Sequence, residues 1–213
     1  MSINLRILLL LIAAFLFKNV AISQSVEYYV GNKRNGIDLM WFKNFKNLNG
    51  EQSSFLFFSR NRSNVDYHDS PTVLGSTNAI SYNFKNGLGI VTVASFLNSG
   101  FVPKAGFQFY KQKGDFMFFG WIVADIKKEG NIDIFGLFRY QPKINEQWNV
   151  FNQIELFPVY NPSSEFWNIT QRIRLGVKYQ NVAFGLMTDL NQSGMSNFTT
   201  TENIGGFLRY EFN

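Results

Sequence analysis

The sequence contains no cysteine and only one histidine. The absence of cysteine excludes disulfide scaffolds, thiol nucleophiles, zinc–cysteine sites and a lipid anchor on an amino-terminal cysteine. One histidine is too few for a transition-metal cluster, and the acidic residues show no calcium-loop spacing. We therefore expect neither a metal nor any other cofactor.

Long apolar runs are also absent beyond the amino terminus, where the stretch Ile7–Phe17 is the exception. This run is shorter than the roughly 20 apolar residues that a transmembrane helix needs. Arg6 precedes it and the small-residue site Ala21-Ile22-Ser23 follows it, which is the three-part pattern of a secretory signal peptide. We expect cleavage after Ser23, with 1–23 removed and 24–213 forming the mature domain. A retained anchor is the alternative.

The positive charge is modest and dispersed. The formal net charge is +5, with 20 basic and 15 acidic residues, and two of the basic residues, Arg6 and Lys18, belong to the leader. The others occur singly along the chain, whereas nucleic-acid binding requires a concentrated stripe of Lys and Arg. Nucleic acid is therefore not an expected partner.

Aromatic residues, in contrast, are abundant, with 24 Phe, 9 Tyr and 4 Trp. Such side chains favour strands, and apolar and polar residues alternate with period two in segments of about ten residues, as in a transmembrane barrel. In 168–179 the aliphatic residues share one face, while Arg172, Arg174 and Lys178 share the other. Three cations on one face cannot contact lipid, so this face is predicted to point into a wet interior. The segments 88–97 and 116–125 are apolar on both faces and cannot be oriented in this way.

Turn residues divide the chain into strands. Asn86-Gly87 is a strong two-residue hairpin signal, whereas the stretches Asp66–Ser76, Pro158–Phe166 and Asn191–Glu202 read as long connections. Eleven strands are predicted after residue 35, at 36–46, 53–65, 77–85, 88–97, 102–112, 115–127, 131–141, 147–157, 168–179, 181–190 and 203–212.

The number of strands follows from a parity argument. Bacterial barrels have an even number of strands, short periplasmic turns and long external loops. With the carboxyl terminus in the periplasm, the three long connections fall outside and Asn86-Gly87 falls inside. An even count needs one more strand, which Ser25–Gly31 supplies. We predict an all-β protein, a closed antiparallel transmembrane β-barrel of twelve strands, or of ten if two weak segments merge.

The last residues carry the first resemblance to a known family. Gly206, Leu208, Tyr210 and Phe212 form the apolar face of the final strand, and Asn213 follows the last aromatic residue. This strand resembles the carboxyl-terminal signature of Gram-negative outer-membrane barrels, although in that family the aromatic residue is terminal. The resemblance implies location in the outer membrane, contact with its lipids and recognition of these four residues by barrel-assembly machinery. The whole pattern also looks like small channels of the twelve-stranded nucleoside-channel type.

Charged residues on the predicted inner faces are the candidate functional residues. Buried charges need partners or water, so the simplest interpretation is a set of ion pairs across the interior between acidic residues (Asp125, Asp133, Glu155 and Asp189) and arginines. The functional alternative is a charged constriction that sets solute preference. Its predicted lining residues are Lys104, Arg139, Glu155, Arg172, Arg174, Lys178, Asp189 and Arg209.

An enzymatic function rests on a single motif. His68 and Ser70 form an H-x-S spacing that resembles the pair used by outer-membrane phospholipases and lipid A deacylases, with Asn78 or Asn83 as an imagined third residue. Pro71 follows directly, however, and the segment reads as the start of an external loop. We therefore expect a solvated His beside Asp69 and no catalysis.

The leading functional hypothesis is a narrow channel for passive diffusion of a small solute, such as an aromatic or mildly anionic molecule. Eight strands leave an interior just filled by side chains, and wide porins need many more, so twelve strands predict a narrow lumen. A non-conducting structural or interaction barrel is the main alternative. A lipid hydrolase and a soluble periplasmic barrel, with a polar outside, are less favoured.

Overall fold

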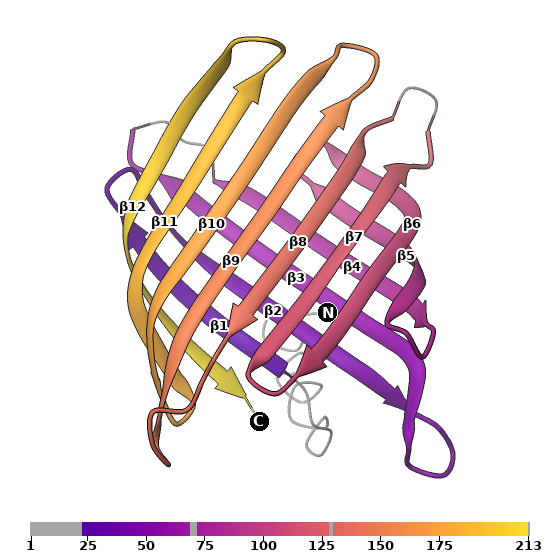
Figure 1. Cartoon of the computed structure of the whole chain (residues 1–213). Helices are drawn as coiled ribbons and strands as arrows, with labels where there is room; N and C mark the ends of the chain where they lie inside the picture. The colour runs from indigo at the N-terminus through magenta and orange to yellow at the C-terminus, as the bar shows by residue number, and fades with distance from the viewer. Residues whose placement is uncertain (1–22, 69–71, 128–129, 213) are drawn as a thin grey trace, which may run out of the picture.

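A computed structural model describes residues 23–68, 72–127 and 130–212, and in these residues twelve antiparallel strands close into one barrel (Figure 1). Each strand pairs with its neighbours in sequence, and β12 pairs with β1, for example Tyr210 with Val26. The twelve-strand prediction is confirmed. The described residues include no helix that is long and apolar enough to cross a membrane. The strands are β1 (Ser23–Gly31), β2 (Arg34–Lys46), β3 (Gln52–Asp66), β4 (Val73–Asn83), β5 (Leu88–Leu97), β6 (Gly100–Lys113), β7 (Phe116–Asp125), β8 (Ile132–Tyr140), β9 (Trp148–Asn161), β10 (Phe166–Tyr179), β11 (Val182–Gly194) and β12 (Phe198–Phe212).

The predicted leader lies outside the described residues, apart from Ser23, where β1 begins. Cleavage after this residue stays a prediction.

The alternation of side chains sets the two surfaces of the barrel. Successive residues of a strand point to opposite sides, so on β10 Arg174 is buried inside while its neighbour Leu175 is 51% exposed. On β11, Asp189 is buried and Leu186 is 72% exposed. The cationic face of 168–179 therefore points inward, as predicted.

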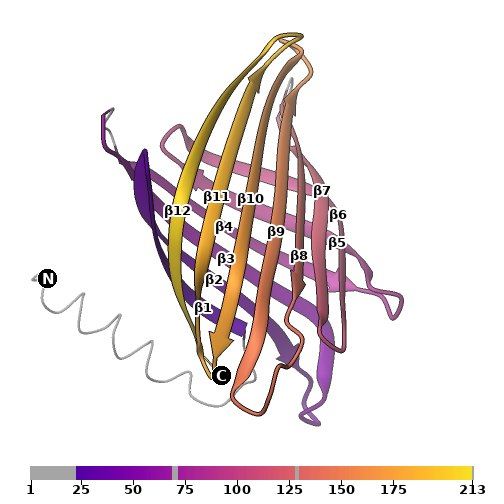
Figure 2. The same cartoon turned by 60° about the vertical axis from the view of Figure 1, so that its left-hand side comes forward.

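The connections differ from the sequence prediction. β4 begins at Val73, β9 continues to Asn161, and β11 and β12 are joined by 195–197 alone, so most of the predicted long loops are strand. Polar residues of these hairpins still form ladder pairs, such as Gln192 with Thr200. The apolar alternation ends before the backbone pairing does, because ladder hydrogen bonds do not require apolar side chains. The β9–β10 and β11–β12 hairpins consequently rise above the rest of the barrel (Figures 1 and 2).

One half of the interior is filled by apolar side chains. The ring of Phe119 on β7 lies 5.0 Å from those of Phe42 on β2 and Phe58 on β3. These strands are not neighbours in the sheet, so opposite walls of the barrel touch here. The contacts also orient the two doubly apolar segments, since Val91 of β5 and Trp121 of β7 are buried inside. Trp121 is thus an internal residue and not part of an interfacial aromatic girdle.

Candidate functional site

The other half of the interior holds a file of charged side chains, which we call the charged file. It lies on one side of the apolar cluster. Its cations are Arg60, Arg62, Arg139, Arg172, Arg174, Lys178 and Arg209, and its carboxylates are Glu27, Asp38, Glu155, Asp189 and Glu211. Seven cations thus face five carboxylates.

At one end of the charged file, Arg60 of β3 bridges two other strands. Its Nε donates to Asp38 Oδ1 of β2 at 3.0 Å, and its Nη1 donates to Glu155 Oε2 of β9 at 2.8 Å. Arg172 Nη1 of β10 donates to the same Glu155 oxygen at 3.2 Å. A guanidinium has five donors in a planar fork, which allows one arginine to join carboxylates from two walls.

The middle of the file is formed by arginines that share carboxylates. Arg62 Nη2 and Arg174 Nη1 donate to the two oxygens of Asp189 at 3.0 and 2.7 Å. Arg174 Nε also donates to Glu27 Oε1 at 2.9 Å, and Arg209 Nε donates to Glu27 Oε2 at 2.9 Å. Arg209 is only 1% exposed and Glu27 is equally buried. The interior is therefore closed at this level by ion pairs.

The file continues to the opposite end through an amide. Gln153 Oε1 accepts from Arg209 Nη1 at 2.7 Å and from Arg139 Nε at 2.9 Å. Arg139 Nη1 lies 3.4 Å from Glu211 Oε1, and Lys178 forms an ion pair with the same carboxylate. An unbroken series of charge-assisted contacts thus links Arg60 and Arg172 to Lys178 and Glu211.

Lys104 belongs to a separate group. Its Nζ lies 2.6 Å from Asp125 Oδ1 and 2.8 Å from Asp133 Oδ2. Asp125 also accepts from the backbone and side chain of Asn131. This cluster fixes the ends of β6, β7 and β8.

All eight predicted lining residues lie inside the barrel and take part in these contacts. Their role in solute preference stays a prediction. The ion pairs expected for Glu155 and Asp189 are present, whereas Asp125 and Asp133 pair with Lys104 instead of arginines. The sequence reasoning missed six residues of the site: Glu27, Asp38, Arg60, Arg62, Gln153 and Glu211.

The missed residues left different signals. Asp38 stands between Ile37 and Leu39, so alternation alone could have assigned it to the interior. The segment 59–64 is polar on both faces, which hid the direction of Arg60 and Arg62.

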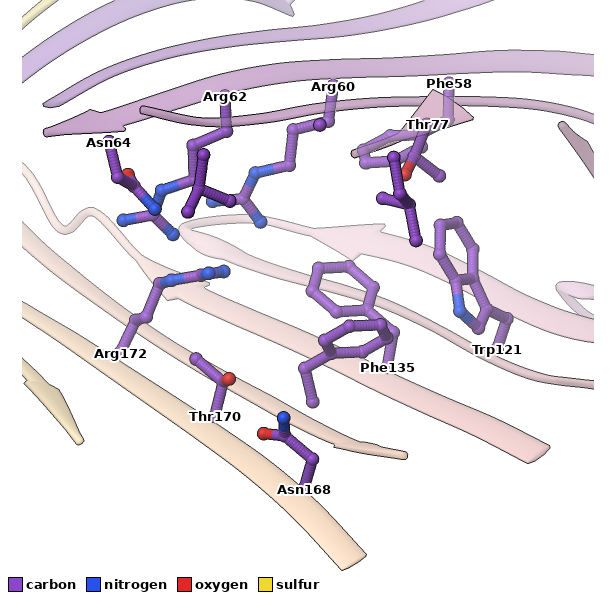
Figure 3. A pocket seen from close by; sticks show the side chains of 14 residues that line it. Phe58, Arg60, Arg62, Asn64, Thr77, Trp121, Phe135, Asn168, Thr170 and Arg172 are labelled. Atoms are coloured by element: carbon purple, nitrogen blue, oxygen red, sulfur yellow. The ribbon is translucent and has the colours of Figure 1, made fainter. Parts of the chain in front are cut away.

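Next to Arg60 and Arg62 lies a cavity of about 390 Å³, which we call the vestibule. In Figure 3 the side chains of Arg60 and Arg62 reach from β3 toward that of Arg172 on the opposite wall. The rest of the lining is aromatic on one side and uncharged polar on the other. It includes Phe58, Trp121, Phe135 and Phe157, and also Asn64, Thr77, Asn168 and Thr170.

The structure gives the H-x-S motif no support. His68 is exposed just after β3, and its backbone N–H donates to Asp66 at 3.2 Å. Ser70 lies outside the described residues. The two imagined partners are engaged elsewhere, since Asn78 accepts from Ser59 and Asn83 from Gln108. Within the described part of the chain, no group of three His, Cys, Asp or Glu residues could hold a metal ion.

The predicted assembly residues lie on the outer face of β12. Leu208, Tyr210 and Phe212 are 55%, 44% and 45% exposed, and Gly206 shares their face. Asn213 lies outside the described residues. Recognition of this strand by assembly machinery stays a prediction.

No family model and no curated protein matches the sequence. Among solved structures, a KdgM porin in complex with disordered oligogalacturonate is 13% identical, with a TM-score of 0.49, over 90% of this chain and 99% of that one. The NanC porin is 13% identical, with a TM-score of 0.48, over 91% and 100%. The β domain of the Bordetella autotransporter BrkA is 9% identical, with a TM-score of 0.37, over 90% and 98%. At this level of similarity the function has to be argued from the residues of the chain itself.

Proposed function

We propose that the protein is an outer-membrane channel for passive diffusion of a small solute, with the charged file as the path of the solute. The observation that carries this proposal is the continuity of the file from the vestibule to Lys178 and Glu211.

Membrane location is supported by the outer surface. Every strand presents a large apolar side chain to the outside, and large exposed apolar surfaces on a protein mark contact with lipid or a partner. A soluble barrel would show the reverse arrangement, with a polar outside and an apolar interior. One such residue for each strand in order is Tyr28, Leu39, Phe55, Ile80, Ile90, Phe107, Ile122, Ile134, Ile154, Leu175, Leu186 and Leu208.

The charged interior supports a channel over a purely structural barrel. Removing charges from water is costly, and well-packed apolar residues often stabilise a protein as much as a buried ion pair does. The apolar half of this interior shows that the chain can fill its barrel with rings. Charged groups retained along the other half indicate a polar route, as charged linings do in pores. The excess of cations over carboxylates favours anions.

Closure at mid-barrel is the observation that favours the alternative, a non-conducting barrel. Arg174 and Arg209 both bind Glu27, and no water reaches these groups. In the proposed channel, this cluster is a constriction that opens when arginines exchange one carboxylate for another or for a passing anion. In the alternative, the cluster never opens.

Conductance separates the two. The purified protein, without residues 1–23, is inserted into a planar bilayer under a salt gradient, and solute uptake is measured in liposomes. We expect discrete current steps with a reversal potential on the anion-selective side. Folded protein that gives no current and no uptake would support the non-conducting barrel and refute the channel.

The remaining expectations belong to this proposal. Lipids of the outer membrane would surround the apolar outer face, and the assembly machinery would read Gly206, Leu208, Tyr210 and Phe212. The absence of enzymatic activity is tested by incubating the protein with phospholipid. Fatty-acid release by the original protein that is lost in the His68→Ala variant would contradict this expectation.

A further inference from the structure

The vestibule has an arrangement of donors and rings that defines a ligand class. We propose that it is a binding site for a small aromatic carboxylate, held with its carboxylate on Arg62 and Arg172 and its ring on the aromatic wall. This inference deepens the channel proposal by naming a class of solute. It rests on that proposal only in treating the bound molecule as one that is transported.

The first observation is that the arginine end of the vestibule has unused donors. Among the described residues, Arg62 Nη1 and Arg172 Nε have no hydrogen-bond partner and are shielded from water. The Arg62 side chain is only 10% exposed and that of Arg172 is 17% exposed. A buried donor without an acceptor carries a desolvation cost, so an acceptor at this position would stabilise the site.

The second observation is that the carboxylates at the same place are each shared by two arginines. Glu155 is shared by Arg60 and Arg172, Asp189 by Arg62 and Arg174, and Asp38 by Arg60 and Arg62. Arg172 Nε stands 4.0 Å from Asp189, too far for a hydrogen bond. A small rotation of the Arg62 or Arg172 guanidinium turns its unused N–H toward the vestibule. A ligand carboxylate at this position would accept hydrogen bonds from the unused N–H groups of both guanidiniums, because its two oxygens match the geometry of guanidinium donors.

The third observation concerns the aromatic wall of the vestibule, a continuous series of rings from β3, β7, β8 and β9. The Phe58 and Trp121 rings are 5.3 Å apart, Trp121 and Phe135 are 5.1 Å apart, and Phe135 and Phe157 are 6.0 Å apart. Aromatic pairs at these separations are favourable in tilted and edge-to-face geometries. A planar aromatic ligand could join this series without displacing a charged group.

Size and polarity agree with a ligand of this kind. The cavity of about 390 Å³ lies within the range of roughly 300–1,000 Å³ typical of small-molecule sites. Such sites combine apolar walls with a few convergent polar groups, here Arg62 and Arg172 with Thr170 and Asn168 beside them. A cation would find the nearby carboxylates Asp38, Glu155 and Asp189 already bound to arginines. A small anion without a ring would leave the aromatic wall unfilled.

The test uses the full mature barrel in detergent and isothermal titration with benzoate. Benzyl alcohol serves as the uncharged analogue, acetate as the anion without a ring, and galacturonate as a non-aromatic acid of similar size. We expect saturable benzoate binding, at least about tenfold tighter than that of each analogue. Benzyl alcohol lacks the charge-assisted hydrogen bonds to the arginines, and acetate and galacturonate lack the ring that packs on the aromatic wall. Equal or tighter binding of any analogue, or no binding of benzoate, would overturn the proposal.

Two variants locate the binding. Arg172→Gln removes a guanidinium and Phe157→Ala removes a ring from the lining of the vestibule, and each is expected to weaken benzoate binding about tenfold or more. Lys46→Gln, exposed at the end of β2 and outside the charged file, is the charge-removing control and should leave affinity unchanged. Retention of the folded, heat-modifiable band on gels shows that each variant is intact. If both vestibule variants fold and bind benzoate as the original protein does, the site is wrong.

Failure of the site and failure of the channel can be told apart. Titration in detergent does not require conduction, so benzoate binding without current would leave the site intact and refute the channel. Anion-selective current without benzoate binding in detergent, and without block by benzoate, would refute the site and leave the channel intact.

Discussion

Arg174 on β10 and Glu27 on β1 are joined by a 2.9 Å hydrogen bond across the barrel, although 147 residues separate them in the chain. The other oxygen of Glu27 accepts from Arg209, and Arg174 also reaches Asp189. Each charge at this level therefore has its partners, and the pairing joins β1 and β10, which are not neighbours in the sheet. This cluster is the constriction of the proposed channel and also a source of stability that depends on its completeness.

Glu27→Gln is expected to destabilise the barrel. The substitution leaves Arg174 and Arg209 buried with too little opposing charge, and breaking a buried pair by removing one partner costs about 3–5 kcal/mol. The free energy of unfolding is measured in micelles with guanidinium chloride, followed by tryptophan fluorescence. Glu51→Gln, in the exposed β2–β3 turn, is the control and should change stability by less than about 0.5 kcal/mol. Equal effects of the two substitutions would show that the cluster contributes nothing.

Phe119→Ala tests whether the apolar half serves packing alone. Phe119 is fully buried against Phe42 and Phe58, so its truncation should cost about 3–5 kcal/mol. Ion selectivity should not change, because the ring lies outside the charged file. Phe116→Ala, on the exterior, is the matched control for loss of a ring. A large change in reversal potential for Phe119→Ala would place the path of the solute in the apolar half instead.

Lys178→Gln tests the charge of the path. Lys178 pairs with Glu211 at one end of the charged file, and its neutralisation reduces the excess of cations from two to one. The reversal potential in a salt gradient should move toward zero, with a smaller preference for anions. Lys46→Gln, exposed at the same end of the barrel, is the control. A shift of the same size for both variants would indicate a general surface effect instead of a lining residue.

The sequence was sufficient to predict the strand number and the direction of most faces, because alternation with period two has a direct structural meaning. It correctly placed Arg174 and Leu175 on opposite sides. It could not predict that Arg174 binds Glu27, since this contact joins strands that are not paired and depends on how the inward side chains of β10 and β1 meet in the interior. The inward direction of Phe119 was equally hidden, because both faces of 116–125 are apolar.

Strand ends were the other failure. Alternation reports where one face of a strand is apolar, and this pattern stops near Asp189 on β11. The backbone pairing continues to Gly194 opposite Phe198. A pattern of apolar residues therefore shows how far the apolar outer face extends along a strand, and not where the hairpin ends.

Gly185→Ala should impair folding. Gly185 of β11 pairs with Gly176 of β10, and a Cβ added at Gly185 would lie 2.2 Å from the Leu175 carbonyl oxygen and 2.5 Å from the Gly176 Cα. Backbone atoms cannot move aside cheaply in a closed sheet, so the heat-modifiable folded band should be reduced on gels. Gly136→Ala is the control, since nothing lies within 4 Å of a Cβ there. Equal folding of the two variants would mean that the backbone around Gly185 can shift far enough to accept the added Cβ.

Leu186→Arg tests the membrane location independently of conduction. Leu186 is 72% exposed on the outer face of β11, and an arginine facing lipid near the middle of a bilayer costs about 2–4 kcal/mol. The free energy of unfolding from lipid vesicles should fall by this amount, because the guanidinium loses its water without gaining a partner. Leu48→Arg, in the exposed turn between β2 and β3, should have little effect. If the two arginine variants were equally stable in vesicles, the outer face would not be in contact with lipid, and the apolar belt would have to be covered by protein instead.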